Sequence, residues 1–156
     1  SEVSMSGNVA VGALAGYAAS RTMDAATSWF HARQSEVSRR PEGEIAPGGA
    51  LVQLGRGRGG ALGRELGDEQ AGRVGLAVHR TFGALYGMAA AALVRRGVRP
   101  LAAGLAMGTA AFVVVDEGTA ISQFTAYPVE SHLRGVVGHA TFGLVAGSLL
   151  AIVERR

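Results

Sequence analysis

Hydrophobic positions gather into four long segments, at residues 9–30, 72–94, 101–124 and 135–153. Each segment is close to the length of about 20 residues that an α-helix needs to cross a bilayer. The fourth segment has no polar face, since its polar side chains are only those of His139, Thr141 and Ser148, whereas a soluble amphipathic helix has one. The pattern predicts an all-α fold, an integral membrane four-helix bundle that forms a single domain over residues 1–156. A soluble protein with a buried four-helix core is the alternative.

The segments are joined by connectors of unequal length. The first connector, residues 32–71, is rich in glycine, arginine and acidic residues. We expect it to be a long extramembrane loop, irregular apart from one short helix at residues 61–66. Its stretch GRGRGGALG, residues 55–63, lacks the Lys-Ser/Thr pair of a phosphate-binding loop, so it is interpreted as a flexible linker. Pro128 should end any helix that precedes the fourth segment.

The composition narrows the possible functions. The chain has no cysteine, which excludes disulfides, thiolate metal sites and thiol nucleophiles. Its net charge is only +3, with 15 basic residues, all arginine, scattered among 12 acids, so we expect no nucleic-acid partner. The sequence contains no nucleophile motif, phosphate loop or Glu-x-x-His pattern, so catalysis has less support than any other function.

A pattern of glycines and ionisable residues occurs twice. The stretch HRTFGALYG, residues 79–87, returns as HATFGLVAG, residues 139–147. The first and third segments each have two glycines four residues apart, followed eight residues later by an aspartate. The first copy consists of Gly12, Gly16, Asp24, His79, Gly83 and Gly87, and the second of Gly104, Gly108, Asp116, His139, Gly143 and Gly147. We therefore expect two repeated helical hairpins, related by a pseudo-twofold axis along the membrane normal.

Helix geometry places the ionisable residues of both copies at one level. Residues four apart share a helix face, so Asp24 and Asp116, like His79 and His139, lie on the glycine stripes of their helices. Stripes of small residues mark contacts between transmembrane helices, so these side chains should face the bundle interior. At about 1.5 Å per residue, all four lie roughly 10 Å below the surface that carries the long connector. Glu117 lies beside them.

Several hypotheses for this layer stay open. If the second and fourth helices lie diagonally, His79 and His139 would bind haem b or a transition metal, with Asp24, Asp116 and Glu117 as further metal ligands. Close glycine contacts between the helices argue against enough space for a porphyrin.

A layer of Asp and His is also typical of proton or cation conductors. Alternatively, the charged groups neutralise one another and serve only to hold the helices together. An accessory or scaffold subunit, bound to other membrane subunits through small-residue helix faces, fits the absence of a catalytic motif.

The residues of both copies also carry a resemblance to a known family. An Asp in the first segment, the pattern H..FG..YG at the start of the second, an acidic pair in the third and AYP…H.RG..GH before the fourth resemble the YagU-like family of small bacterial inner-membrane proteins. The resemblance implies a polytopic inner-membrane protein connected with acid stress and without an assigned chemistry. The long arginine-rich connector departs from what the family leads us to expect.

Arginines at the segment ends predict the orientation. Arg95, Arg96 and Arg99 lie in the shortest connector, and Arg155 and Arg156 end the sequence. With four spans these residues lie on one side of the membrane, and the positive-inside rule assigns that side to the cytoplasm. We therefore expect a multi-pass protein of the bacterial inner membrane with both termini cytoplasmic. The arginines of the long connector conflict with this orientation.

Overall fold

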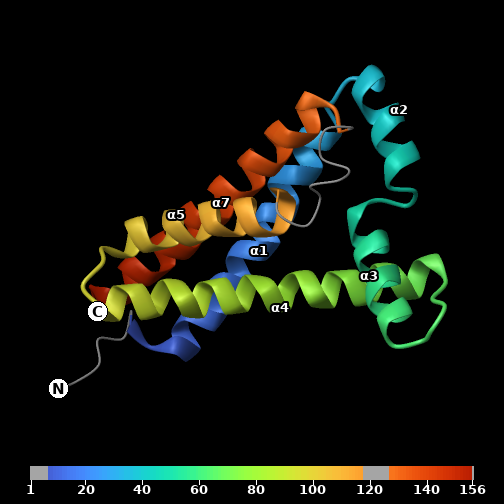
Figure 1. Cartoon of the computed structure of the whole chain (residues 1–156). Helices are drawn as coiled ribbons and strands as arrows, with labels where there is room; N and C mark the ends of the chain where they lie inside the picture. The colour runs from blue at the N-terminus through green and yellow to red at the C-terminus, as the bar shows by residue number, and fades with distance from the viewer. Residues whose placement is uncertain (1–6, 118–126, 156) are drawn as a thin grey trace.

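The fold is built from helices and is shown in Figure 1, a computed structural model that describes residues 7–117 and 127–155. No strand occurs among these described residues. The elements are α1 (Val9–His31), α2 (Glu36–Ile45), α3 (Ala50–Ala61), α4 (Asp68–Arg95), α5 (Pro100–Ala111), the π-helix η2 (Phe112–Glu117) and α7 (Val129–Glu154). The sequence-based prediction of an all-α protein is confirmed.

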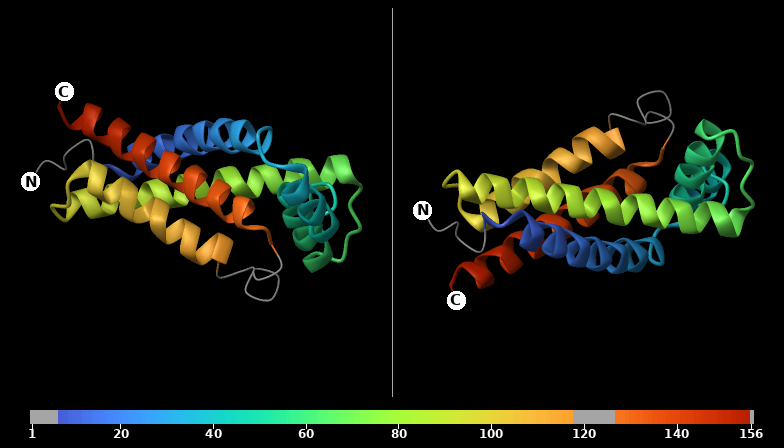
Figure 2. Two further views of the ribbon diagram at one scale, coloured as in Figure 1. Left: turned by 90° about the horizontal axis from the view of Figure 1, so that it is seen from above. Right: turned by 90° about the horizontal axis from the view of Figure 1, so that it is seen from below.

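Four long helical elements surround the centre of the molecule. Helix α1 packs against α4 and α7, and α5 packs against the same two helices, whereas α4 and α7 touch at few points. Helices α4 and α7 therefore lie diagonally across the bundle. The views in Figures 1 and 2 place the α4–α5 turn and the end of α7 at one end of the molecule, and α2 and α3 at the opposite end.

The helix boundaries follow local sequence signals. The Asn8 side chain caps α1 by accepting a hydrogen bond of 2.8 Å from the backbone N–H of Ala10, as Asn does at many helix starts. Pro100 stands at the first position of α5 and Pro128 caps α7, where a missing N–H costs nothing. Gly97 closes the turn between α4 and α5 with a φ of +91°, which favours glycine.

Glycines form the closest contacts between helices, as their spacing predicts. A Cβ added to Gly16 would lie 2.0 Å from the carbonyl oxygen of Gly83, across the α1–α4 contact. A Cβ on Gly104 would lie 2.3 Å from the carbonyl oxygen of Gly143, across the α5–α7 contact. Both distances are far below van der Waals contact, so these backbones touch because no side chain separates them.

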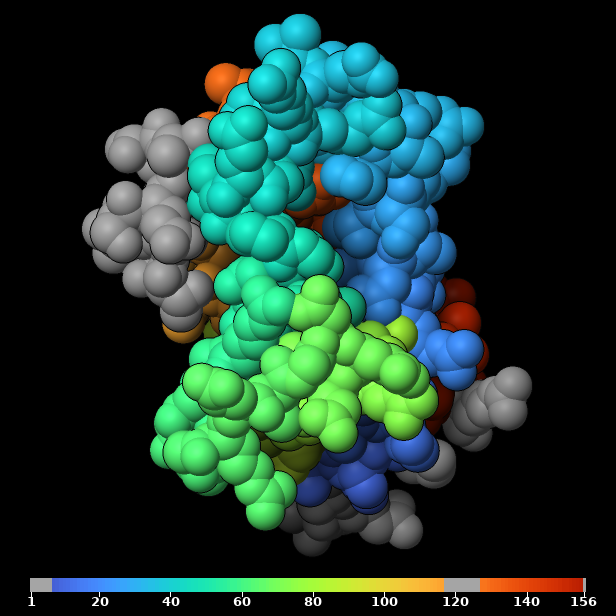
Figure 3. All heavy atoms as spheres, turned by 90° about the vertical axis from the view of Figure 1, so that its right-hand side faces the viewer, coloured from blue at the N-terminus to red at the C-terminus, as the bar shows by residue number. Residues whose placement is uncertain are grey.

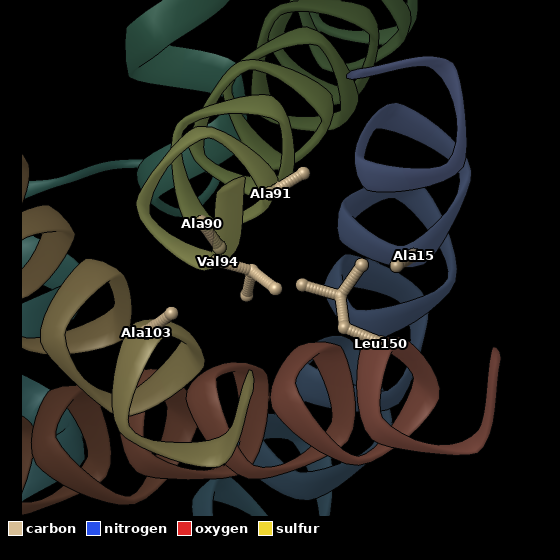
Figure 4. Packing of buried hydrophobic residues seen from close by; sticks show 6 residues of the cluster. All are labelled: Ala15, Ala90, Ala91, Val94, Ala103 and Leu150. Carbon is tan, nitrogen blue, oxygen red and sulfur yellow. The ribbon is translucent and has the colours of Figure 1, made fainter. Parts of the chain in front are cut away.

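The buried core consists mostly of small side chains. Figure 4 shows Leu150 of α7 reaching between the helices toward Val94, with Ala15, Ala91 and Ala103 around it. Among the described residues, Leu150 and Ser20 have the largest fully buried side chains. Large apolar side chains lie on the outside instead: Leu14, Tyr17, Leu85, Val113, Val114, Leu144 and Ile152 are all exposed. Many large apolar side chains are therefore exposed, and the larger members of the buried core are Val94, Phe142 and Leu150.

The connector between residues 32 and 71 differs from its prediction. It contains two helices, α2 and α3, and the segment predicted as a short helix at residues 61–66 is non-helical beyond Ala61, the last residue of α3. The glycine-rich stretch predicted as a flexible linker lies largely within α3. A Cβ on Gly55 would lie 1.7 Å from the carbonyl oxygen of Ala71 in α4, so α3 is held by a close backbone contact that the composition does not reveal.

The four hydrophobic segments correspond only in part to candidate membrane spans. Among the described residues, α7 is the single helix that is long and apolar enough to cross a bilayer. The third segment forms a shorter apolar helix, Pro100–Asp116, whose last turns are π-helical, and residues 118–124 of the predicted segment lie outside the described residues. The helical nature of all four segments is confirmed where they are described, and a multi-pass arrangement stays a prediction.

Candidate functional site

The first Asp–His pair joins α1 to α4. Nε2 of His79 lies 2.9 Å from Oδ1 of Asp24, although the approach lacks the alignment of a hydrogen bond. Arg80 Nη2 lies 2.5 Å from Oδ2 of the same carboxylate, and Arg80 Nη1 donates a hydrogen bond of 2.9 Å to Oγ of Ser20. Arg80 thereby compensates the charge of Asp24, a role that sequence spacing alone offers equally to Arg21.

The second Asp–His pair joins η2 to α7. Nε2 of His139 lies 3.1 Å from Oδ1 of Asp116, again without hydrogen-bond alignment. Position 140, which corresponds to Arg80 in the repeat, is an alanine, and position 112, which corresponds to Ser20, is a phenylalanine. The Phe112 ring packs against the His139 ring with centroids 5.7 Å apart. No arginine pairs with Asp116 among the described residues, so the two pairs differ in charge.

Both imidazoles line one cavity at the centre of the bundle. The cavity has a volume of about 70 Å³, and its wall includes His79, His139, Phe82 and Phe142. Leu54 of α3 also lines it, so the connector helix covers this part of the bundle. The lining is mostly apolar, which leaves the two imidazoles as its main titratable groups, and the volume is enough for at least one water molecule.

His139 is the most buried ionisable group of the site. Its side chain is 9% exposed, against 22% for His79, 31% for Asp24 and 36% for Asp116. Nδ1 of His139 is buried and has no hydrogen-bond partner among the described residues. A buried imidazole nitrogen without a partner carries a desolvation cost, so this atom is where a water or other small ligand would gain most by binding.

The predicted metal layer divides into two separate pairs. Among the described residues, no group of three or more His, Asp or Glu side chains comes together as metal ligands. Asp24 lies with His79 and Asp116 with His139, while the side chain of Glu117 lies outside what the structure describes. A haem or metal site at these five residues therefore stays a prediction that the geometry does not favour.

A second polar cluster, which sequence reasoning missed, holds α2 to α7. Arg134 of α7 pairs with the carboxylate of Glu42 in α2 and donates to Oε1 of Gln34 at 2.9 Å. Gln34 Nε2 and Ser131 Oγ each donate to Oε2 of Glu42 at 2.8 Å. Burial raises the pKa of Glu42, but the hydrogen bonds from Arg134, Ser131 and Gln34 and the Arg134 charge outweigh it, so the pKa lies below its ordinary value.

We call this cluster, Gln34, Ser38, Glu42, Ser131 and Arg134, the α2–α7 clasp. Gln34 and Ser38 are buried, and Gln34 Nε2 also donates to Ser38 Oγ at 2.8 Å. The partners are separated by up to about a hundred positions in the sequence, so no local motif marks them. Gln34, Ser38 and Glu42 lie in a connector that is rich in polar residues throughout, and Ser131 and Arg134 lie in the first turns of α7, so composition does not single them out.

Comparison of the chain with protein-family models, curated proteins and solved structures finds no match. The resemblance to YagU-like proteins therefore stays a prediction, and the interpretation of the site depends on its geometry.

Proposed function

We propose that this chain is a multi-pass protein of the bacterial inner membrane that exchanges protons at its central cavity. The membrane proposal is supported by the distribution of apolar side chains: glycine and alanine fill the contacts between helices, while large hydrophobic residues point outward. In water such a surface promotes aggregation. In lipid it is solvated, and small residues at helix contacts are what drives association.

The proposed architecture has two hairpin-like units. Helix α1 with α4 forms one unit and α5–η2 with α7 forms the other, related by a pseudo-twofold axis along the membrane normal. The support comes from equivalent contacts: Gly16 against Gly83 in one unit and Gly104 against Gly143 in the other. The Asp–His pairs occupy equivalent positions, so both units present an imidazole to the same cavity.

The observation that carries the functional proposal is that each pair forms a row of groups from a carboxylate, through an imidazole, to the central cavity. In each pair, a partly exposed carboxylate lies within about 3 Å of an imidazole Nε2, and the imidazole lines the cavity. An imidazole can accept a proton on one nitrogen and release one from the other. An excess proton carried by cavity water would pass to Nδ1 of His139 while the Nε2 proton passes to Asp116, which then releases it toward the surface. The water and the imidazole both end neutral, and the ring proton must return from Nδ1 to Nε2 before the next transfer.

The two pairs should differ in their contribution. Asp24 is held in an ion pair by the permanent charge of Arg80. Asp116 has no arginine beside it among the described residues, so no fixed positive charge holds it. We therefore assign the mobile proton to Asp116 and His139, and a fixed, mainly structural role to Asp24 and Arg80.

The cofactor hypotheses receive less support from the same geometry. A cavity of about 70 Å³ between the two imidazoles is far smaller than a porphyrin, so His79 and His139 do not fit around haem b in this arrangement. A transition metal would have to take water for most of its ligands, since no third protein ligand group joins them among the described residues. The accessory-subunit hypothesis is tested by whether another protein copurifies in a fixed ratio.

The experiment that tests the proposal is proton flux into proteoliposomes that contain a pH-sensitive dye. Wild-type protein should carry protons above the level of empty vesicles. Asp116→Asn should reduce the flux to that level, and Asp24→Asn should reduce it less. Asp68→Asn removes an exposed carboxylate of α4 that pairs only with Arg56, and it serves as the control with unchanged flux.

Three outcomes would disprove the assignment. Wild-type protein that gives no flux above empty vesicles would eliminate conduction, and unchanged flux in Asp116→Asn would eliminate the second pair as the proton carrier. Equal effects of the two aspartate variants would contradict the distinction between the pairs.

The chain has only four histidines, so ¹⁵N NMR of labelled protein can follow the His139 ring separately and show whether its protonation changes across the pH range of the flux.

A further inference from the structure

Four exposed arginines gather at the end of the bundle where α4 turns into α5. Arg95, Arg96 and Arg99 lie within five positions, and Arg155 follows α7. Helix α7 contacts the start of α5 at Gly147, whose added Cβ would lie 2.9 Å from the carbonyl oxygen of Pro100, and Arg155 follows about two turns further along α7. Figures 1 and 2 show the α4–α5 turn and the end of α7 at the same end of the molecule. We call these four residues the turn arginines.

The turn arginines have no acidic partner in the part of the chain that the structure describes. Near the opposite end, four arginines form ion pairs, Arg40 with Glu44, Arg56 with Asp68, Arg73 with Glu69 and Arg134 with Glu42, whereas Arg33, Arg39, Arg58 and Arg64 form none among the described residues. Figure 3 shows α2, α3 and the first turns of α4 covering that opposite end. Carboxylates therefore pair with half of the arginines at that end and with none of the turn arginines.

The local structure holds the turn arginines at the edge of the apolar surface. Arg95 is the last residue of α4, Arg96 caps it, and Arg99 caps α5 immediately before Pro100. The neighbouring Leu101 is 44% exposed on the outer surface. In the proposed membrane orientation, an exposed apolar side chain next to a guanidinium marks the boundary between acyl chains and headgroups.

We propose that the turn arginines bind the phosphate groups of anionic phospholipids on this side of the membrane. This inference rests on the proposed membrane placement but not on proton exchange. A guanidinium donates two parallel hydrogen bonds to a phosphate, and the short turn keeps three such groups together. Because the turn arginines have no carboxylate to compete, phosphate is their best available partner. The surface potential of an anionic leaflet adds to the attraction, and each arginine should contribute about fivefold in lipid preference.

The test compares how much phosphatidylglycerol and phosphatidylcholine the full chain retains in native mass spectrometry, after extraction from nanodiscs of equal composition. The wild type should retain phosphatidylglycerol preferentially. The triple variant R95Q/R96Q/R99Q should lose that preference, by about fivefold per arginine. The matched control R40Q/R58Q/R64Q removes three exposed arginines of the opposite end and should keep it.

Wild-type protein without a preference, or a turn variant that keeps it, would overturn the proposal. Loss of the preference in both triple variants would show a general charge effect and would also overturn it. Displacement of phosphatidylglycerol by millimolar inorganic phosphate would identify a free-anion site instead. If the turn variant fails to fold, the wild-type preference must still fall as salt rises. A protein that conducts protons without any lipid preference would refute this inference alone.

Discussion

Gly55 and Gly57 lie two positions apart in α3, yet alanine at each should have opposite effects. A Cβ on Gly55 would lie 1.7 Å from the carbonyl oxygen of Ala71, whereas a Cβ on Gly57 would have no atom within 4 Å. Ordinary contact begins at 3.4 Å, so alanine at 55 requires α3 and α4 to separate by well over an ångström. Alanine at 57 meets no obstacle.

The magnitudes follow from two opposing terms. Replacing glycine by alanine inside a helix stabilises it by up to about 1 kcal/mol at either position. At position 55 the steric conflict costs about 1–3 kcal/mol, and more where backbone must move. Helix α3 contains four glycines in twelve residues, so its intrinsic helix stability is low. Its order therefore depends on this contact, and we expect Gly55→Ala to release α3 from α4.

Hydrogen–deuterium exchange of residues 50–61 in detergent or nanodiscs measures this release. Exchange should become faster in Gly55→Ala, by up to about 30-fold for a net loss of up to about 2 kcal/mol once the helix gain is subtracted from the steric cost, and slower by up to about 5-fold in Gly57→Ala. Because the effect is local, exchange in α7 should not change. If the two variants behave alike, or if residues 50–61 exchange fully in the wild type, α3 is not held by this contact and the reasoning fails.

Three further predictions concern the clasp and the core. The pKa of Glu42 is lower in the folded protein than its ordinary value, so the clasp stabilises α2 above about pH 4.5, and this contribution is lost as pH falls through the lower pKa of the folded state. Hydrogen exchange in α2 should therefore become faster as pH falls through that value, beyond its intrinsic pH dependence. Glu42→Gln should remove this additional pH dependence. Arg134→Ala should destabilise α2 docking by roughly 1–3 kcal/mol, while Arg39→Ala, an exposed change, should have no effect in the same assay. Leu150→Ala should cost about 2–5 kcal/mol in detergent unfolding, and equal stability of Leu150→Ala and the exposed Leu144→Ala would contradict the core assignment.

Local patterns were sufficient to predict much of the site. Spacings of four residues place Asp24, Asp116, His79 and His139 on the glycine faces of their helices, and this depends only on helix geometry. The structure adds the pairing of each aspartate with the histidine across its own glycine contact. The sequence predicts only in part that the two Asp–His pairs differ in charge. Arg21 and Arg80 are both candidates to pair with Asp24, and spacing along a helix does not reveal which one does; in the structure it is Arg80.

The connector could not be predicted in the same way. Its glycines and arginines indicate an irregular loop by composition, because glycine has low helix propensity, yet α3 forms where Gly55 allows its backbone to touch Ala71. The clasp likewise joins Gln34 and Glu42 to residues of α7. Helix periodicity and glycine spacing are properties of neighbouring residues and can be read from the chain. Contacts between distant backbones, and the choice of partner for each arginine, depend on the packed arrangement and arise only when the helices meet.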